Sequence, residues 1–119
     1  MMTAVLFAQN TPPDFDRAKT LLNQGETADS IRMLELLVAE DSENASKVYY
    51  LAKAYSWADR WDDALVMYPR AASLDVKKGE IYFQSKFGIA QVKGWKKKYK
   101  APTEFGFALK VTSLRNLYI

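Results

Sequence analysis

The stretch from Leu51 to Asp75, LAKAYSWADRWDDALVMYPRAASLD, alternates small and large apolar residues at helical spacing and is interrupted once, at Ala58-Asp59-Arg60. Small residues let two helices approach closely and large ones fill the remaining space, so this alternation predicts two antiparallel helices joined by a tight turn. The same pattern occurs 34 residues earlier, where Ala18, Leu21, Gly25, Leu34, Leu37 and Asp41 correspond to Ala52, Tyr55, Asp59, Tyr68, Ala71 and Asp75. We therefore expect a repeated helical hairpin.

A period of 34 residues, with small, aromatic and turn residues at these positions, resembles the tetratricopeptide (TPR) repeat. The resemblance implies an all-α fold, a short α-solenoid of about two and a half TPR-like helical hairpins in a right-handed stack. The repeats are expected at about 11–44, 45–78 and, more divergent, 79–113. It also implies a non-enzymatic scaffold that presents a concave helical surface to a peptide or protein partner.

Two phrases, LAKAYSWADRWDDAL and FGIAQVKGW, also resemble the repeats that precede the barrel in YaiO-type outer-membrane proteins. This resemblance implies a location in the bacterial cell envelope, in the periplasm or associated with the outer membrane, with the cytoplasm as the alternative. Residues 1–10 are interpreted as the remnant of a secretory signal peptide or as a disordered N-terminus. Membrane association is expected only through a missing segment or a partner.

Local signals predict the helix boundaries of the first repeat. Thr11-Pro12-Pro13 interrupts the chain, and Asp14 is suited to cap a helix that ends near Gln24. Gly25 provides a tight turn, and Thr27 is the expected cap of the second helix. The buried stripe of that helix is predicted to be Ile31, Leu34, Leu37 and Val38.

The second repeat is expected to start near Ala45 and to turn at Ala58-Asp59-Arg60. Its predicted inward residues are Val48, Leu51, Ala52, Tyr55, Trp61, Ala64, Leu65, Tyr68 and Ala71. Pro69 falls inside the second helix of this repeat, where it removes a hydrogen bond and predicts a bend.

A third unit begins after Gly79, with a helix predicted to end near Gly94. Its predicted inward residues are Ile81, Tyr82, Phe87, Ile89, Ala90 and Val92. The apolar residues of 103–113 alternate, which is the pattern of a half-buried strand. We nevertheless favour a helix there, because the preceding repeats predict one. The uncapped ends of such a stack leave room for a homo-oligomer.

The chain has no histidine and no cysteine, which excludes disulfides, thiolate or imidazole metal ligands, and nucleophiles activated by histidine. Catalysis would rest on carboxylates or lysines. Asp62 and Asp63 are better explained by the start of a helix, where unpaired amides favour negative charge. No glycine-rich phosphate loop or calcium loop occurs in the sequence. We expect no enzyme activity, no metal and no cofactor.

Charge is divided unevenly along the chain. Residues 1–75 carry 12 acidic and 7 basic side chains, whereas residues 76–119 carry 2 acidic and 10 basic ones. The densest basic run, Lys93–Lys100, is interpreted as a solvated turn. Its alternative role is to tether the domain to anionic lipid, polysaccharide or nucleic acid, through Lys93, Trp95, Lys96, Lys97, Lys98 and Lys100. The leading hypothesis includes no nucleic-acid partner.

In a TPR stack, partners are bound by the first helix of each hairpin. An exposed aromatic ring and a lysine in each repeat offer stacking, apolar contact and pairing with carboxylates. The residues predicted to bind a protein or peptide partner are Phe15, Lys19, Asn23, Tyr49, Lys53, Trp57, Phe87 and Gln91.

Overall fold

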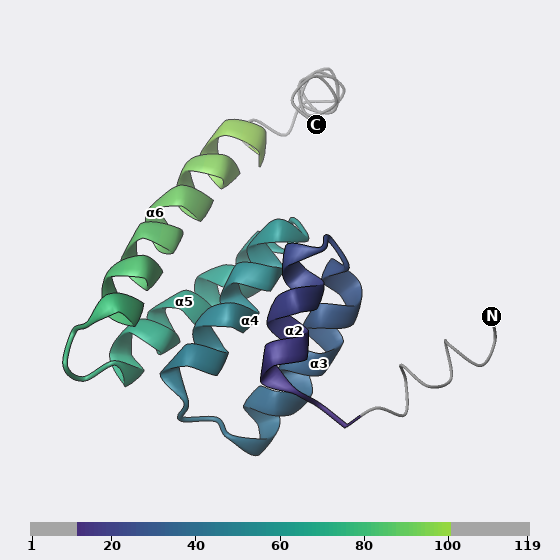
Figure 1. Cartoon of the computed structure of the whole chain (residues 1–119). Coiled ribbons are helices and arrows are strands. Elements are labelled where there is room, and N and C mark those ends of the chain that lie inside the picture. The colour runs from purple at the N-terminus through teal and green to yellow at the C-terminus, as the bar shows by residue number, and fades with distance from the viewer. Residues whose placement is uncertain (1–11, 101–119) are drawn as a thin grey trace.

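The computed structural model describes residues 12–100 and consists, over that range, of five α-helices without a strand. The helices are α2 (Phe15–Asn23), α3 (Thr27–Glu40), α4 (Ala45–Trp57), α5 (Trp61–Leu74) and α6 (Glu80–Lys100) (Figure 1). The all-α prediction is therefore confirmed for the described part of the chain. The predicted signal remnant at 1–10 and the predicted helix at 103–113 lie outside the described residues.

The first hairpin begins where its sequence signals place it. Asp14 caps α2, and its carboxylate accepts hydrogen bonds from the backbone N–H groups of Asp16 at 3.0 Å and Arg17 at 3.4 Å. Gly25 has a φ of 85°, which only glycine adopts without strain, and the chain reverses there. The predicted stripe of α3 is confirmed, since Ile31, Leu34, Leu37 and Val38 are all buried.

The predicted cap of α3 is wrong. Thr27 is the first residue of the helix, and Glu26 occupies the N-cap without a side-chain hydrogen bond. The Thr27 hydroxyl instead donates to the carbonyl oxygen of Gly25, at 3.5 Å. A threonine hydroxyl can donate to a nearby backbone carbonyl as well as accept from an amide. The threonine two positions after the glycine turn was therefore compatible with a cap or with this turn contact.

The second hairpin follows the predicted register. Asn44 caps α4 by accepting from the Lys47 N–H, and Asp59 turns the chain with a φ of 61°. The predicted inward residues are buried apart from Leu65, which is half-buried. Pro69 is exposed within α5, which is assigned as one helix from Trp61 to Leu74. The bend predicted at Pro69 stays a prediction.

Each helix packs against the next along the chain, from α2 through α6. In addition, α2 contacts α4 and α4 contacts α6, so α4 lies beside both of these helices (Figure 1). Helix α4 therefore contacts both the helices that precede it and those that follow it in the chain. Among the described helices, α6 contacts only α5 and α4.

The start of the third predicted unit differs from the prediction. The helix predicted to end near Gly94 continues to Lys100, so the predicted turn at Lys93–Lys100 is wrong. The added turns pack against the start of α5: the rings of Tyr99 and Trp61 lie 6.1 Å apart, and Lys96 Nζ lies 2.5 Å from Asp62 Oδ1. These contacts stabilise helix past Gly94, which is by itself only weakly unfavourable in a helix interior.

The buried side of α6 is formed by Ser85, Gly88 and Val92. Of the predicted inward residues, Val92 is buried and Ile81, Tyr82 and Ile89 are half-buried, but Phe87 and Ala90 are exposed. The prediction of these two as inward residues is wrong because the small residues Ser85 and Gly88 take up the buried side of α6. Gly88 lets the helix approach Tyr68 closely, which rotates the larger side chains outward. No helix in the described range 12–100 is both long and apolar enough to cross a membrane.

Candidate binding face

Aromatic rings and lysine ammonium groups alternate along one face of α2 and α4. Lys19 Nζ lies 4.5 Å from the ring centroid of Phe15 and 5.6 Å from that of Tyr50. Lys53 Nζ lies 5.6 Å from the centroid of Tyr50 and 5.0 Å from that of Trp57. The rings of Phe15 and Tyr50 meet edge to face with centroids 5.5 Å apart. We call Phe15, Lys19, Tyr50, Lys53 and Trp57 the aromatic–lysine ladder.

Helical spacing places these side chains in one row. On α4, Lys53 and Trp57 follow Tyr50 by three and seven residues. On α2, Lys19 follows Phe15 by four. Each set therefore shares one face of its helix. Contact between α2 and α4 joins the two rows. The ladder therefore depends on the packing of the two hairpins and is absent from either one alone.

Ladder residues remain accessible to a partner. Trp57 is 47% exposed, and Phe15, Lys19, Tyr50 and Lys53 are half-buried. Lys19 Nζ also lies 3.4 Å from Asp16 Oδ1, whereas Lys53 forms no ion pair within residues 12–100. An ammonium group held over two aromatic faces is partly desolvated and still free to bind a carboxylate.

Sequence reasoning selected Tyr49 where the structure places Tyr50 on the accessible side. Tyr49 is 9% exposed and packs between Tyr50 and Tyr68, with ring centroids 5.3 and 5.9 Å away. Burial raises the pKa of the Tyr49 hydroxyl to about 12. The spacing of Tyr50 to Lys53 and Trp57 was the available signal for the accessible tyrosine.

The remaining predicted partner-binding residues do not join the ladder. Asn23, Phe87 and Gln91 are exposed, the first at the end of α2 and the other two on α6. The structure thus brings together Phe15, Lys19, Lys53 and Trp57 from the predicted set and adds Tyr50.

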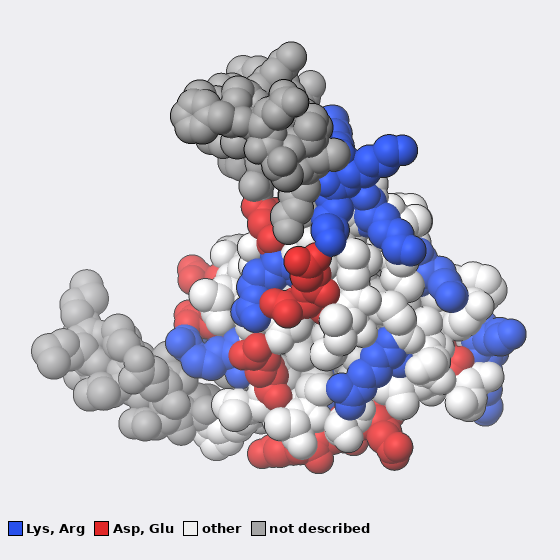
Figure 2. Space-filling model, turned by 180° about the vertical axis from the view of Figure 1, so that it is seen from behind, with Lys and Arg blue, Asp and Glu red and all other residues white. Residues whose placement is uncertain are grey.

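The basic run predicted as an anionic-surface candidate lies on the last turns of α6. Lys93, Lys97 and Lys98 are exposed, Trp95 is half-buried and Lys96 pairs with Asp62; Lys100 belongs to the helix, and its side chain is outside the description. Figure 2 shows lysine and arginine side chains gathered over α6, with acidic side chains beside them.

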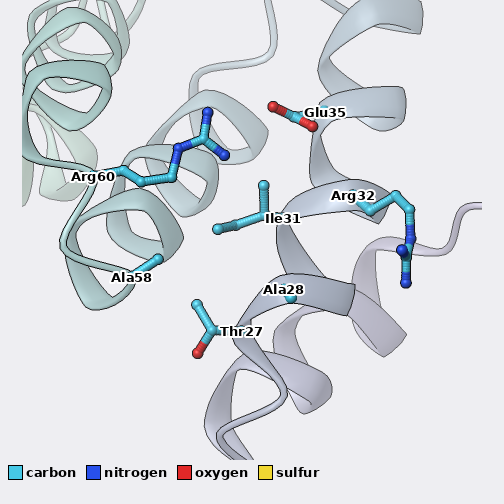
Figure 3. Close-up of a pocket in the computed structure, with 7 residues that line it drawn as sticks. All are labelled: Thr27, Ala28, Ile31, Arg32, Glu35, Ala58 and Arg60. Atoms are coloured by element: carbon cyan, nitrogen blue, oxygen red, sulfur yellow. The ribbon is translucent and has the colours of Figure 1, made fainter.

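A pocket of about 530 Å³ opens elsewhere, between α3 and the turn that joins α4 to α5. Its lining residues are Thr27, Ala28, Ile31, Arg32, Glu35, Ala58 and Arg60 (Figure 3). Figure 3 shows Arg60 directed toward Glu35 across the pocket, whereas Arg32 points away from it.

The charged groups of this pocket are already engaged within the chain. The Tyr55 hydroxyl donates to Glu35 Oε2 at 2.6 Å, and the Arg60 guanidinium lies 4.5 Å from the Tyr55 ring centroid. Burial and this hydrogen bond raise the pKa of Tyr55 above its ordinary value. Arg60 pairs with Asp63, and Arg32 pairs with Asp29. We interpret the contacts among Glu35, Tyr55 and Arg60 as structural ones that hold the two hairpins together.

The acidic residues at the start of α5 occupy structural positions. Asp62 and Asp63 lie in the first helical turn, as predicted, and pair with Lys96 and Arg60 respectively. In the part of the chain that the structure describes, no three acidic side chains come close enough together to hold a metal ion.

Comparisons with protein-family models, with curated proteins and with solved structures found no match to this chain.

Proposed function

We propose that the chain is a TPR-like helical-repeat module that binds a segment of a partner protein along the aromatic–lysine ladder. Two features support the repeat architecture: the 34-residue period of the first two hairpins, and the contacts of α4 with both α2 and α6. In a right-handed stack of such hairpins, the first helix of each pair lines the concave surface. In such a stack α2 and α4 are the first helices of two pairs, and the ladder lies on them.

The observation that carries the proposal is the unbroken alternation of rings and ammonium groups across two helices. Its rings offer apolar and stacking contact, and its two lysines attract carboxylates. The aromatic rings and ammonium groups of the ladder are suited to binding, so its chemistry favours recognition of a partner. The partner is expected to be a peptide or protein segment with apolar and acidic residues.

The test is capture of proteins from bacterial envelope and cytosolic extracts by the immobilised full chain. A Lys53→Glu, Trp57→Ala variant removes the accessible end of the ladder. A Val66→Ala, Lys77→Glu variant is the matched control, since Val66 is 61% exposed on α5 and Lys77 is exposed in a turn. Circular dichroism verifies that both variants fold.

We expect a protein that is captured by the wild-type chain and the control but lost with the ladder variant, by at least about tenfold in affinity once purified. This binding should persist in about 0.5 M salt, because apolar contacts are not screened. Equal capture by all three chains would contradict the proposal.

A second candidate function is the basic tether, supported by Lys93, Lys97 and Lys98, which are exposed together on one helix. It predicts capture of anionic lipid, polysaccharide or nucleic acid that falls steeply with salt and is indifferent to the ladder variant. The same experiment therefore separates the two functions.

A further inference from the structure

The outward side of α6 carries apolar residues that no described helix covers. Phe83 is 65% exposed and Phe87 is 69% exposed, although both are large hydrophobic residues. Ala90 and Gly94 are also exposed, and a Cβ added at Gly94 would meet no atom within 4 Å. Figure 1 shows α6 at the edge of the helical array. We call Phe83, Phe87, Ala90 and Gly94 the outer seam.

The spacing of the outer seam is that of a helix-pairing surface. Its residues are separated by four, three and four positions, which is the alternation of the a and d positions of a heptad repeat. At about 100° per residue, the seam lies opposite the buried side formed by Ser85, Gly88 and Val92. A residue spacing of this kind keeps one stripe facing a second helix along its length.

The positions that flank the outer seam carry only positive or neutral side chains. In the heptad that the seam defines, Lys86 and Lys93 take equivalent flanking positions on one side, and Gln84, Gln91 and Lys98 take those on the other. All five are exposed, and none of the three lysines forms an ion pair within the described range. Residues at these positions select the partner of a paired helix through their charge.

We propose that the outer seam docks an α-helix of a partner protein that carries apolar residues at heptad spacing with Asp or Glu beside them. Phe83 and Phe87 supply apolar contact area, and Ala90 and Gly94 let the backbone of the second helix approach closely. Lys86 and Lys93 attract its acidic flank. This surface lies on α6, whereas the aromatic–lysine ladder lies on α2 and α4.

Charge and shape favour this occupant over two others. A second copy of the chain has the same lysines and glutamines at these flanking positions and no acidic residue, which opposes self-pairing. An anionic bilayer would gain little from Ala90 and Gly94, which lie in the lysine-rich half of the helix and have almost no side chain to insert. The same small residues favour a closely packed helix.

The probe is a fluorescent synthetic peptide of about three heptads with leucine at the a and d positions and glutamate at the e and g positions. A second peptide has the same leucines and lysine in place of each glutamate. Binding to the full chain is measured by anisotropy. A Phe83→Ser, Phe87→Ser variant removes the large seam residues, and a Lys86→Glu, Lys93→Glu variant reverses the flank. Val66→Ser is the control for an exposed apolar residue elsewhere.

We expect the wild-type chain and the control to bind the acidic peptide, and the seam variant to bind it at least about tenfold more weakly. The flank-reversed variant should lose the acidic peptide and gain the basic one, because the sign of the flank sets the choice of partner. Such a reversal is not produced by a general loss of structure.

Three results would overturn the proposal. The first is absence of binding between the acidic peptide and the wild-type chain, or binding that the seam variant retains. The second is a lower melting temperature for the seam variant than for the wild-type chain and the other variants. Phe83 and Phe87 would then stabilise the chain without a partner, which means that the chain itself covers them. The third is binding of the full chain to phosphatidylglycerol vesicles that the seam variant abolishes, which would assign the surface to lipid.

Discussion

Gly88 of α6 lies directly against the ring of Tyr68 of α5. A Cβ added at Gly88 would come within 2.5 Å of Cζ of that ring and within 2.8 Å of two further ring carbons. Tyr68 is 3% exposed and Gly88 is buried, so neither can move into solvent without opening the helix pair. The absence of a side chain at position 88 therefore sets how closely α6 approaches the rest of the protein.

Gly88→Ala is expected to destabilise the chain by about 1–3 kcal/mol, because the added methyl group overpacks a closed contact. Gly94→Ala is the matched change on the same helix, where the added carbon meets nothing within 4 Å. It should stabilise by about 0.5–1 kcal/mol, since alanine is the better helix former. Urea denaturation measures both; the same sign of effect at the two positions would contradict the packing of α6.

Asn44→Ala should cost about 1 kcal/mol, because the Asn44 carboxamide accepts the hydrogen bond of the Lys47 N–H at the start of α4. Thr27→Ala should change the unfolding free energy by less than about 0.5 kcal/mol, because Thr27 lies inside α3 and caps nothing. Thermal or urea unfolding of the two variants side by side provides the measurement. A loss at Thr27 as large as that at Asn44 would restore the cap predicted from sequence.

Tyr49→Ala and Tyr50→Ala separate the core from the ladder. Tyr49 is buried against Tyr68, so its removal should cost about 3–5 kcal/mol, as for other large buried aromatic residues. Tyr50 is half-buried, and its removal should cost clearly less while it weakens partner binding through the loss of the ring between Lys19 and Lys53. Stability and binding measured on the same samples check the assignment. Equal destabilisation by the two variants would argue against it.

Stability should fall at alkaline pH. Burial raises the pKa of Tyr49 to about 12 and raises that of Tyr68 above its ordinary value of 10.0. Above pH 10 the unfolded chain loses these phenolic protons while the folded chain retains them, so the unfolding free energy decreases as pH rises from 10 toward 12. Its slope is at most about 1.4 kcal/mol per pH unit for each tyrosine. Below pH 10 the contribution of both is fully present.

Urea titrations between pH 8 and pH 12 measure this decrease, and Tyr49→Phe is the control. The phenylalanine variant should show a shallower decline, because it has one ionisable group fewer. An unfolding free energy that rises above pH 10 would contradict the burial of these hydroxyl groups.

Apart from the cap at Thr27, the sequence was sufficient for the helices and inward residues of the first two hairpins, because most of their signals are local and repeated. Asp14, Gly25 and Asp59 mark boundaries, and the 34-residue period fixes which residues point inward. The signals at α6 were local too, but there tertiary contacts decided the outcome. Gly94 predicted a helix end, whereas the packing of Tyr99 on Trp61 and of Lys96 beside Asp62 carries the helix through it.

The sequence predicted only part of the aromatic–lysine ladder, because tertiary contacts also decide which of its residues are exposed. Lys53 and Trp57 stand out because charged and aromatic residues share one helical face. Tyr49 and Tyr50 are chemically identical neighbours about 100° apart on the helix, so composition does not distinguish them. Packing of Tyr49 against Tyr68 selects which of the two is buried, and this contact joins residues from different helices.

The ladder lysines are themselves one period apart, since Lys19 and Lys53 are separated by the 34 residues that separate the hairpins. If the hairpins form the proposed stack, insertion of a second copy of residues 45–78 would add another tyrosine, lysine and tryptophan to the row. Affinity for an extended partner would then grow by the addition of whole hairpins, without any change in the chemistry of a single contact.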